Sequence, residues 1–541
     1  MKRIWQKHYG DMSPEIRWEQ DGSVADLIER AAEKFADLPA VACFGTTLSY
    51  RQVERLSRDF AAYLQNGLGL EQGARVAIML PNIIPFHVAS FGMIRAGMVQ
   101  VNVNPMYTPH ELAHQLNDSG AETIVVASMV SATLGAVLEQ TQIKTVITVD
   151  LADLTAAPIP AAPVHEAITG AIALTDALAQ GAELAFKRPE ITQDDLIFLQ
   201  YTGGTTGLSK GAMLSHGNLV SNVAVYDALA GAITEEGKEI VITPIPMYHI
   251  FALMVNCLCY WRYGALNVLI ADPRDMAGFV KTLSQYKFTA MTGVNTLYNG
   301  LLHTPGFAEL DFSSLKVCWG GGAPIQEAVS HKWHDITGGH IREGYGLSET
   351  SPIVSMNLVA RNAYTGTIGI PVPSTDISLR DENGVEVEIG AEGELCVRGP
   401  QVMQGYWNRP DATAEVMTED GYFCTGDVAV ADADGFFRIV DRKKDMILVS
   451  GFNVYPNEIE GAVALIPGIV ECACIGVPDD HTGEAVKVFA VRNDDTLTEA
   501  MVRRTCRETL TGYKVPATVE FIDELPKSSV GKILRRELRQ V

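Results

Sequence analysis

Helical patterns and short apolar runs alternate through the first two thirds of the chain. One helical pattern begins at Ser23, where Asp26 completes a capping box. Leu27, Ala31 and Phe35 follow at helical spacing. The apolar runs that predict strands are residues 75–79, 99–103, 123–127, 144–149, 196–200, 241–245, 266–270, 289–292 and 316–319. This alternation predicts a layered α/β domain.

The pattern changes near residue 368. From there the strand-like runs are short and turns such as Asn383-Gly384 recur, which predicts a β-rich subdomain. A charged stretch follows at residues 441–445, and the chain after it has a βα pattern of its own. We therefore predict a large N-terminal domain over residues 1–441 and a small C-terminal α+β domain over residues 442–541.

Composition limits the classes of function. The chain has 541 residues, which is too many for one compact core. Its net charge of −23 argues against nucleic acid and against a general attraction to anionic lipid. The N-terminus lacks the apolar run of a signal peptide, and the longest apolar stretch, residues 250–270, is interrupted by Asn256 and Arg262. Nine scattered cysteines without a C-x-x-C pattern favour buried thiols in a reducing compartment over disulfides or a metal site.

The most distinctive stretch follows the apolar run at residues 196–200. It reads Tyr-Thr-Gly-Gly-Thr-Thr-Gly-Leu-Ser-Lys-Gly from residue 201 to residue 211. Glycine lets backbone N–H groups turn toward a ligand, and hydroxyls and a lysine add donors, so this composition suits a polyphosphate. Ser209 before Lys210 departs from the Walker pattern. A flexible polar loop is the alternative interpretation.

Three further stretches carry groups that suit a nucleotide. Residues 345–350 place an aromatic ring, a hydroxyl and a carboxylate close together, and a carboxylate can hold Mg²⁺. Residues 320–324 form a Gly-Gly-Gly-Ala-Pro loop after a predicted strand. Asp427 ends the stretch 422–427, and its acceptor-only carboxylate suits the two hydroxyls of a ribose. Taken singly, each stretch is also explained as an ordinary turn or cap.

Two charged stretches and one histidine complete the set. Residues 441–445, Asp-Arg-Lys-Lys-Asp, would ordinarily be a solvated linker. Residues 526–536 place Lys532 directly after a glycine, and their plain interpretation is a charged C-terminal helix with its lead-in loop. His249 stands in a Pro-x-x-His pattern, where a packed core histidine is the more common finding than a catalyst.

In this order, the stretches resemble the motifs of the adenylate-forming superfamily of acyl-CoA synthetases, luciferases and peptide-synthetase adenylation domains. The resemblance covers nearly the whole chain. Within the superfamily, the chain is most similar to bacterial long-chain fatty acyl-CoA synthetases. The residues behind that narrower resemblance are 67–70, 101–105, 115–120, 293–297 and 441–460. It implies layered α/β subdomains with a β-rich subdomain in the large domain, followed by a small mobile C-terminal domain.

The resemblance implies roles for individual residues. The expected catalytic residues are Lys532, Glu349 and Thr205. The expected magnesium ligands are Glu349 and either Thr205 or Thr206. The expected nucleotide contacts are Tyr201, Thr202, Gly203, Gly204, Thr205, Thr206, Gly207, Lys210, Gly321, Gly322, Tyr345, Gly346, Ser348, Asp427 and Arg442. The expected acyl-site residues are His249, Leu253, Val294, Gly320 and Gly322, within walls at 249–258, 291–297 and 318–324. Lys444 is the expected pivot of the C-terminal domain, and Gly451 begins a strand expected to line the CoA channel.

The implied activity is a two-step ligation. A fatty-acid carboxylate attacks the α-phosphorus of MgATP, which gives acyl-adenylate and pyrophosphate, while Lys532 bridges the two anions. The C-terminal domain then turns about Lys444, and the thiol of coenzyme A displaces AMP. The expected substrates are therefore a long-chain fatty acid, ATP with Mg²⁺, and CoA.

Two alternatives stay open. One is a ligase of the same fold for medium-chain, aryl or amino acids. The other is a membrane-associated fatty-acid capture protein with a vestigial nucleotide site, against which the set Lys532, Glu349 and Asp427 argues. Leu253 stands where some long-chain enzymes of the family carry a gating tryptophan, so we expect no tryptophan gate. We expect a cytoplasmic location, with transient contact at the inner face of the plasma membrane and a homodimer left open.

Overall fold

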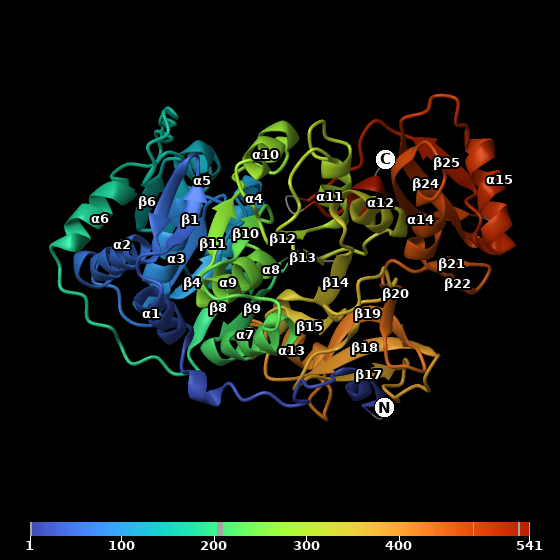
Figure 1. Cartoon of the computed structure of the whole chain (residues 1–541), viewed down its shortest axis with the longest axis horizontal. Helices are drawn as coiled ribbons and strands as arrows, with labels where there is room; N and C mark the ends of the chain where they lie inside the picture. Colours follow the sequence, from blue (N-terminus) through green and yellow to red (C-terminus); the bar gives the residue numbers. More distant parts are fainter. Residues whose placement is uncertain (1–2, 203–208, 480, 529–530, 540–541) are drawn as a thin grey trace.

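The computed structural model describes residues 3–202, 209–479, 481–528 and 531–539. Its first sheet has the strand order β7-β6-β5-β3-β4-β8-β9 and is parallel up to β8, to which β9 is antiparallel. Figure 1 shows the whole chain, with β4, β6, β8 and β9 of this sheet labelled. The bounds are β3 (Arg75–Met79), β4 (Val99–Asn102), β5 (Thr123–Ala127), β6 (Thr145–Val149), β7 (Ile172–Ala173), β8 (Leu196–Tyr201) and β9 (Gly211–Ser215).

The second sheet has the order β16-β15-β14-β13-β12-β10-β11-β1-β2. Its centre, from β14 to β1, is parallel, and antiparallel strands close both edges. The bounds are β1 (Pro39–Cys43), β2 (Thr46–Ser49), β10 (Ile240–Thr243), β11 (Leu266–Leu269), β12 (Ala290–Gly293), β13 (Val317–Gly320), β14 (Ile341–Gly346), β15 (Ile353–Met356) and β16 (Ile370–Pro371).

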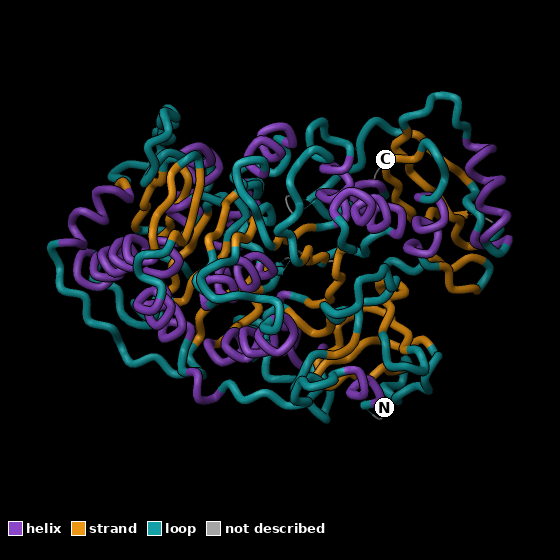
Figure 2. Tube along the Cα trace, in the orientation of Figure 1, coloured by secondary structure: helices purple, strands orange, loops and turns teal. Residues whose placement is uncertain are grey.

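Helices form a middle layer between these two sheets and an outer layer on each, as Figure 2 shows. The middle layer, which shares the largest apolar core with both sheets, contains α1 (Val24–Lys34), α2 (Tyr50–Ala62), α3 (Ile84–Arg95), α7 (His216–Ala230), α8 (Ile250–Ala252), the π-helical η6 (Leu253–Cys259) and α9 (Tyr260–Arg262). The outer helices are α4 (Pro109–Ser119) and α5 (Ser131–Gly135) on the first sheet, and α10 (Met276–Leu283), α11 (Asn295–Leu302) and α12 (Glu327–Thr337) on the second. Every residue of α3 is buried, as expected for a helix covered on all sides.

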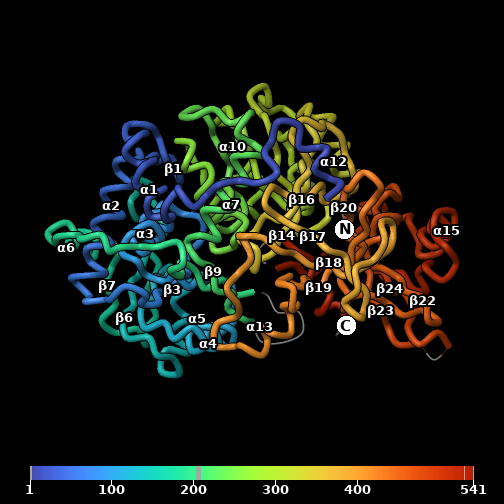
Figure 3. The backbone as a smooth tube through the Cα atoms, turned by 90° about the horizontal axis from the view of Figure 1, so that it is seen from below, coloured from blue at the N-terminus to red at the C-terminus, as the bar shows by residue number. Residues whose placement is uncertain are grey.

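A smaller antiparallel sheet follows, with the order β17-β18-β19-β20. Its strands are β17 (Asp376–Arg380), β18 (Glu392–Arg398), β19 (Phe423–Ala431) and β20 (Phe437–Arg442). The N-terminus lies beside this sheet in Figure 3. Trp5 and Tyr9 of the N-terminal segment belong to the apolar core of this sheet. Helix α13 (Pro410–Val416) lies between β18 and β19 in the chain.

The last sheet is built from the C-terminal residues. Its strands are β21 (Ile447–Val449), β22 (Phe452–Val454), β23 (Ile469–Asp479), β24 (Gly483–Arg492) and β25 (Thr518–Phe521). Helices α14 (Pro456–Ala464) and α15 (Glu499–Thr509) cover one face, and α16 (Arg535–Leu538) packs on the other. The predicted boundary at residues 441 and 442 stays a prediction.

The predicted α/β fold and its strands are confirmed, with strand ends that differ by one or two residues. The run at 241–245 ends early, at Thr243, because Pro244 and Pro246 cannot continue the backbone pairing. The capping box at Ser23 is present. In the β-rich region, β16 joins the second sheet, so the smaller sheet begins only at Asp376. Within the described ranges, no helix combines the length and the apolar character that a bilayer crossing needs.

A buried network around Arg535 attaches α16 to α14 and to residues 441–445. Arg535 Nη2 lies 2.8 Å from Glu460 Oε2 and donates to Asn457 Oδ1 at 2.9 Å. Its Nη1 lies 3.7 Å from Asp445 Oδ2 and 4.0 Å from Asp441 Oδ1. Asp441 is fully buried and also accepts a hydrogen bond from Asn457 N at 2.9 Å. The guanidinium therefore balances three carboxylates that water reaches poorly.

We expect Arg535→Met to destabilise the C-terminal residues by about 3 kcal/mol, because it leaves buried carboxylates without their cation. Hydrogen exchange of the α14 and β23 amides measures this local stability, and it should accelerate on the order of 10²-fold.

Lys514→Met is the matched control. Lys514 Nζ lies 2.7 Å from Glu458 Oε2 on the same helix α14, but the Glu458 side chain is 42% exposed. An exposed pair of this kind contributes about 1 kcal/mol or less, so exchange should change far less. Equal acceleration in the two variants would contradict the role given to Arg535.

Candidate active site

The predicted site residues gather at the carboxyl ends of parallel strands. Tyr201 ends β8, Gly320 ends β13 and Gly346 ends β14, while Val294 directly follows β12. In open α/β sheets this edge is where ligands bind. The fold therefore brings together chain segments that lie far apart in the sequence.

The centre of the predicted phosphate loop lies outside the described residues. This applies to Gly203, Gly204, Thr205, Thr206 and Gly207, whose phosphate and magnesium contacts stay predictions. The two ends of the loop are described. Thr202 N donates to Lys210 O at 3.0 Å, so the chain enters and leaves the loop at one place.

Lys532 reaches this edge from the C-terminal residues. A Cβ atom placed on Gly322 would lie 3.1 Å from Lys532 Cε and 3.8 Å from Val294 Cγ1. Thr296 Oγ1 donates to Gly531 O at 2.8 Å, which fixes the chain before the lysine against α11. The structure therefore brings Lys532, Gly322 and Val294 into one place, beside Gly320 and Gly321.

Lys532 is surrounded by other predicted site residues. Partial burial and the nearby Arg442 guanidinium lower the pKa of the Lys532 ammonium to about 8, whereas the Asp427 and Glu349 carboxylates oppose this shift. Burial and the charge of Lys532 lower the pKa of His249 to about 3, so that imidazole is neutral at pH 7. Lys532 is charged below about pH 8, and a bound anion would favour that charge further.

Asp427 lies between an aromatic hydroxyl and a guanidinium. Tyr345 Oη donates to Asp427 Oδ2 at 2.6 Å, and Arg442 Nε lies 3.4 Å from Asp427 Oδ1. Pairing of β19 with β20 places Asp427 directly opposite Arg442. Each carboxylate oxygen has further acceptor capacity, so the group can still receive hydroxyl donors. Gly346 follows Tyr345 at the strand end, and Ser348 begins the short 3₁₀ turn η7 (Ser348–Thr350).

Glu349 is buried in η7 with only 8% exposure. Its Oε1 accepts a hydrogen bond of 2.7 Å from Tyr406 Oη. Burial raises the pKa of the Glu349 carboxyl, and the Tyr406 hydrogen bond opposes that rise. In the described part of the chain, no group of three or more His, Cys, Asp or Glu forms a metal cage. Mg²⁺ in nucleotide sites is commonly held by one or two carboxylates with substrate phosphates, which suits a single buried glutamate.

Residues 403–409, here called the strap, tie this carboxylate to the phosphate loop. The strap's Tyr406 ring lies 4.9 Å from Lys210 Nζ, while its hydroxyl is bound to the glutamate. Trp407 N donates to Gly211 O at 2.8 Å at the far end of the loop. One tyrosine thus contacts both a predicted phosphate ligand and the predicted metal ligand.

The start of the loop is held through Asp118. Tyr201 Oη donates to Asp118 Oδ2 at 2.7 Å, and Arg409 of the strap forms an ion pair with Asp118 Oδ1. Trp407 Nε1 donates to Asp118 O at 3.2 Å. The Tyr201 hydroxyl is therefore already engaged within the protein.

The sequence pattern assigned no role to the strap. The available signal was the run Gly-Tyr-Trp-Asn-Arg-Pro at 405–410, in which aromatic and turn-forming residues stand together. Asp118 was noted only as part of the stretch 115–120, one of the stretches behind the family resemblance. Neither stretch shows which residues the strap or Asp118 would contact, because the contacting residues lie far apart in the sequence.

Three predicted residues lie apart from this group. Lys444 is exposed between β20 and β21. A Cβ atom on Gly451 would meet no atom within 4 Å, so Gly451 faces open space at the start of β22. Leu253 is fully buried in the main apolar core. The pivot, channel and acyl-site roles of these residues stay predictions.

A large cavity of about 1440 Å³ opens beside the chain that precedes Lys532. Its lining includes Val294, Thr296 and Gly531 near the lysine, and the exposed side chains of Phe44, Met106 and Met129. Of the three predicted acyl walls, only residues 291–297 contribute to this lining.

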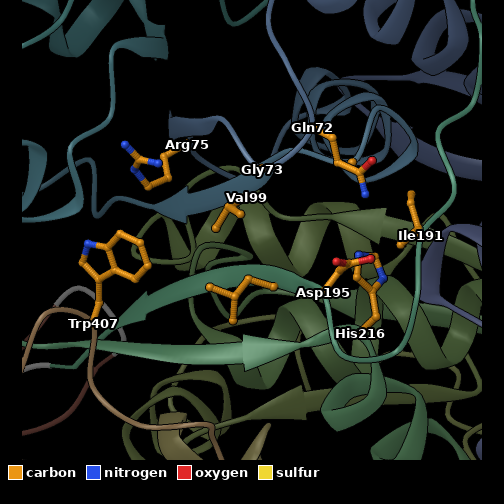
Figure 4. Close-up of a pocket in the computed structure, with 10 residues that line it drawn as sticks. Gln72, Gly73, Arg75, Val99, Ile191, Asp195, His216 and Trp407 are labelled. Atoms are coloured by element: carbon orange, nitrogen blue, oxygen red, sulfur yellow. The ribbon is translucent and has the colours of Figure 1, made fainter. Parts of the chain in front are cut away.

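A second cavity of about 220 Å³ lies at the opposite ends of β3, β4 and β8 (Figure 4). Arg75, Asp195, His216 and Trp407 line it. None of the described residues predicted for the site is among its lining residues, although Trp407 belongs to the strap.

The chain is similar to known proteins along its whole length. The family model described as AMP-binding enzyme matches residues 28–407, and the AMP-binding enzyme C-terminal domain matches residues 458–532. A long-chain-fatty-acid–CoA ligase of Yersinia pestis is 52% identical, over 100% of this chain and 98% of that protein. A feruloyl-CoA synthase of an Amycolatopsis species is 35% identical, over 94% of this chain and 97% of that protein.

The solved structure of ATP-bound MatB from Rhodopseudomonas palustris superposes with a TM-score of 0.83 at 30% identity and covers 95% of this chain and 98% of that one. Since both family models match and a relative is more than half identical along the whole chain, this protein belongs to the AMP-binding enzyme family.

Proposed function

We propose that this protein is an ATP-dependent long-chain fatty acid–CoA ligase that forms an acyl-adenylate and passes the acyl group to CoA. The observation that carries the proposal is the contact between Lys532 and the Gly322 loop, close to Asp427 and Glu349. The name of the Yersinia pestis relative, which is 52% identical along the whole chain, supports both the acid and the acceptor.

The first half-reaction requires two anions, a carboxylate and the α-phosphate, to meet. The Lys532 ammonium lies where it can offset their repulsion, because it is held against the Gly322 loop and is charged below about pH 8. His249 stays neutral and adds no charge to this balance. Asp427 offers acceptor oxygens to the ribose hydroxyls.

Glu349 is the described residue best suited to hold Mg²⁺, with Thr205 as the proposed second ligand. When bound, the metal would neutralise charge on the β- and γ-phosphates. The strap fixes the Glu349 carboxylate and the Lys210 ammonium relative to each other, since both contact Tyr406. In this proposal the protein catalyses the reaction by positioning the reactants and by stabilising the negative charge on the phosphates.

The second half-reaction requires the lysine to make way for the thiol of CoA. The C-terminal residues turn about Lys444 in this proposal, which withdraws Lys532 and brings the strand after Gly451 to the site. Exposure of both Lys444 and Gly451 leaves them free to make new contacts. Cytoplasmic location, transient contact with the inner face of the plasma membrane and a homodimer also remain proposals.

The length of the acyl chain determines how much binding energy an apolar tunnel can supply. Each buried methylene contributes roughly 0.8 kcal/mol, so a long chain contributes on the order of 10 kcal/mol before ordering costs. The 35% identical feruloyl-CoA synthase makes an aryl acid the second candidate substrate.

A panel of acids tests the proposed function. Purified protein with MgATP and CoA should release AMP and pyrophosphate with palmitate or oleate at least about tenfold faster than with octanoate, benzoate or ferulate, since each methylene adds binding energy. If only aryl acids or amino acids support AMP release, the fatty-acid assignment is wrong.

Lys532→Ala should separate the two half-reactions. Pyrophosphate exchange with ATP should fall about 10²–10³-fold, because the variant loses a cation that stabilises the transition state. Thioester formation from supplied acyl-AMP should stay within about threefold of the parent rate, since the lysine has left the site at that stage.

Lys527→Ala is the control for this test. Lys527 lies in the same loop but forms an ion pair with Glu471 at 2.7 Å. Its substitution should leave both half-reactions near the parent rates. An equal loss of both half-reactions in Lys532→Ala would refute the assigned role.

Tyr406→Phe removes only the hydroxyl that contacts Glu349. We expect the Mg²⁺ concentration for half-maximal adenylation to rise about tenfold, the equivalent of one hydrogen bond to a charged group. Tyr422→Phe, which loses a hydroxyl bound instead to Asp376, should not change this concentration. Matching Mg²⁺ curves for Tyr406→Phe and the parent would show that the strap does not position Glu349.

A further inference from the structure

Two of the nine cysteines differ from the rest in their surroundings. All nine lie in the described residues and are free thiols. Seven belong to the apolar core clusters, namely Cys43, Cys257, Cys259, Cys318, Cys472, Cys474 and Cys506. Cys396 and Cys424 belong to none of these clusters, and Cys424 is only half-buried.

These two thiols face each other across neighbouring strands. Cys396 on β18 and Cys424 on β19 are directly paired in the antiparallel register, and their sulfur atoms lie 3.3 Å apart. Directly opposed residues of such strands have Cα atoms about 4.5–5.5 Å apart, which lies within the range that a disulfide spans. Leu395 and Val397 point into the apolar core, so alternation along β18 places Cys396 on the opposite face.

The neighbours of the pair favour a reactive thiolate. The Cys396 thiol donates a hydrogen bond to the Cys424 sulfur, and this bond lowers the pKa of Cys424 with help from Arg380 and Lys443. Burial and the Glu394 carboxylate oppose the shift. A half-buried thiolate beside a second thiol has the arrangement expected of a reactive cysteine with a resolving partner.

We propose that Cys396 and Cys424 are a redox modification site, in which a peroxide converts the thiol pair to a cross-strand disulfide that weakens ATP binding. The Cys424 thiolate attacks a peroxide oxygen, which breaks the O–O bond and gives a sulfenic acid and, after proton transfer, water. The Cys396 thiol then attacks the sulfenic sulfur, which forms the S–S bond and releases a second water. Two thiols lose two electrons and two protons, and hydrogen peroxide takes them up as it becomes two waters. A dithiol reductant reverses the change.

The effect on ATP follows from the place of the pair in the sheet and rests on the proposed function. Cys424 stands three residues before Asp427, at a register shift between Glu394 and Cys396. Two hydrogen bonds hold this bulge, from Thr425 Oγ1 to Leu395 O at 2.7 Å and from Gly426 N to Glu394 Oε1 at 3.1 Å.

A disulfide would cross-link the two strands directly beside that bulge. An S–S bond of about 2.05 Å requires the sulfurs to approach by about 1.3 Å from their separation of 3.3 Å, which fixes the torsions of both side chains. The bulge orients the carboxylate proposed to bind the ribose, so a cross-link that constrains the bulge should weaken contacts to the nucleotide. The acyl and CoA contacts proposed above involve other parts of the chain.

The test is carried out on the full-length protein with hydrogen peroxide as oxidant. Peptide mass mapping should find one disulfide, between Cys396 and Cys424, at peroxide levels that leave the other seven thiols free. The KM for ATP in pyrophosphate exchange should rise about two- to tenfold, the equivalent of one hydrogen bond to the ribose, and dithiothreitol should restore it. Absence of the disulfide, or an unchanged KM for ATP after it forms, would overturn the proposal.

Serine variants supply the controls. Cys396→Ser and Cys424→Ser should keep the KM for ATP of the reduced parent, and neither variant can form the cross-strand disulfide when peroxide is added. Cys506→Ser, which alters a core thiol in the C-terminal residues, should respond like the parent. Because the cross-link is detected by mass, failure of this proposal is distinguishable from absence of ligase activity in the reduced protein.

Discussion

The site depends on a local positive charge, the Lys532 ammonium, in a protein whose overall negative charge repels ATP. A net charge of −23 opposes the approach of ATP, so positive charge has to be concentrated locally. Lys532 provides it at Gly322, where a side chain would lie 3.1 Å from the lysine Cε and where φ is +78°. The absence of a Cβ atom at Gly322 therefore leaves room for the lysine. The lowered pKa of Lys532, about 8, reflects the cost of burying the ammonium there beside the Arg442 guanidinium.

The strap provides a second constraint, on the geometry of the groups proposed to contact the phosphates. Tyr406 contacts Glu349 through its hydroxyl and Lys210 through its ring, so two groups of opposite charge are positioned by one rigid side chain. Asp118 holds the other end of the loop through Tyr201 and the strap. Both described ends of the loop are therefore held by contacts to other parts of the chain.

Local patterns predicted the elements well, since caps and strand alternation depend on residues a few positions apart. The capping box at Ser23 and the nine predicted strands of the two large sheets follow from such patterns, whereas β1, β2, β7, β9, β14, β15 and β16 were not predicted. The contacts of the site do not, because Tyr406 and Glu349 are 57 residues apart and Tyr201 and Asp118 are 83 apart. Hydrophobic periodicity cannot predict contacts between residues so far apart in the sequence. Resemblance to a family, rather than any spacing in the chain, predicted that Lys532 enters the site.

The residues on either side of the proposed pivot, Lys444, contact different parts of the protein. Lys443 is held by the smaller sheet, since its N donates to Gly426 O at 3.0 Å and its Nζ lies 3.2 Å from Glu394 Oε2. Asp445 is held at 2.9 Å by Arg539, which directly follows the C-terminal helix α16. Lys444 stands between these two attachments and is exposed, so a rotation there breaks neither of them. Asp441 is one of the contacts that span the pivot, because its backbone pairs with β19 while its side chain accepts from Asn457 N at the start of α14. A rotation of the C-terminal residues about Lys444 therefore has to break the Asp441 contact, which makes that buried carboxylate a stabiliser of the arrangement in which Lys532 occupies the site.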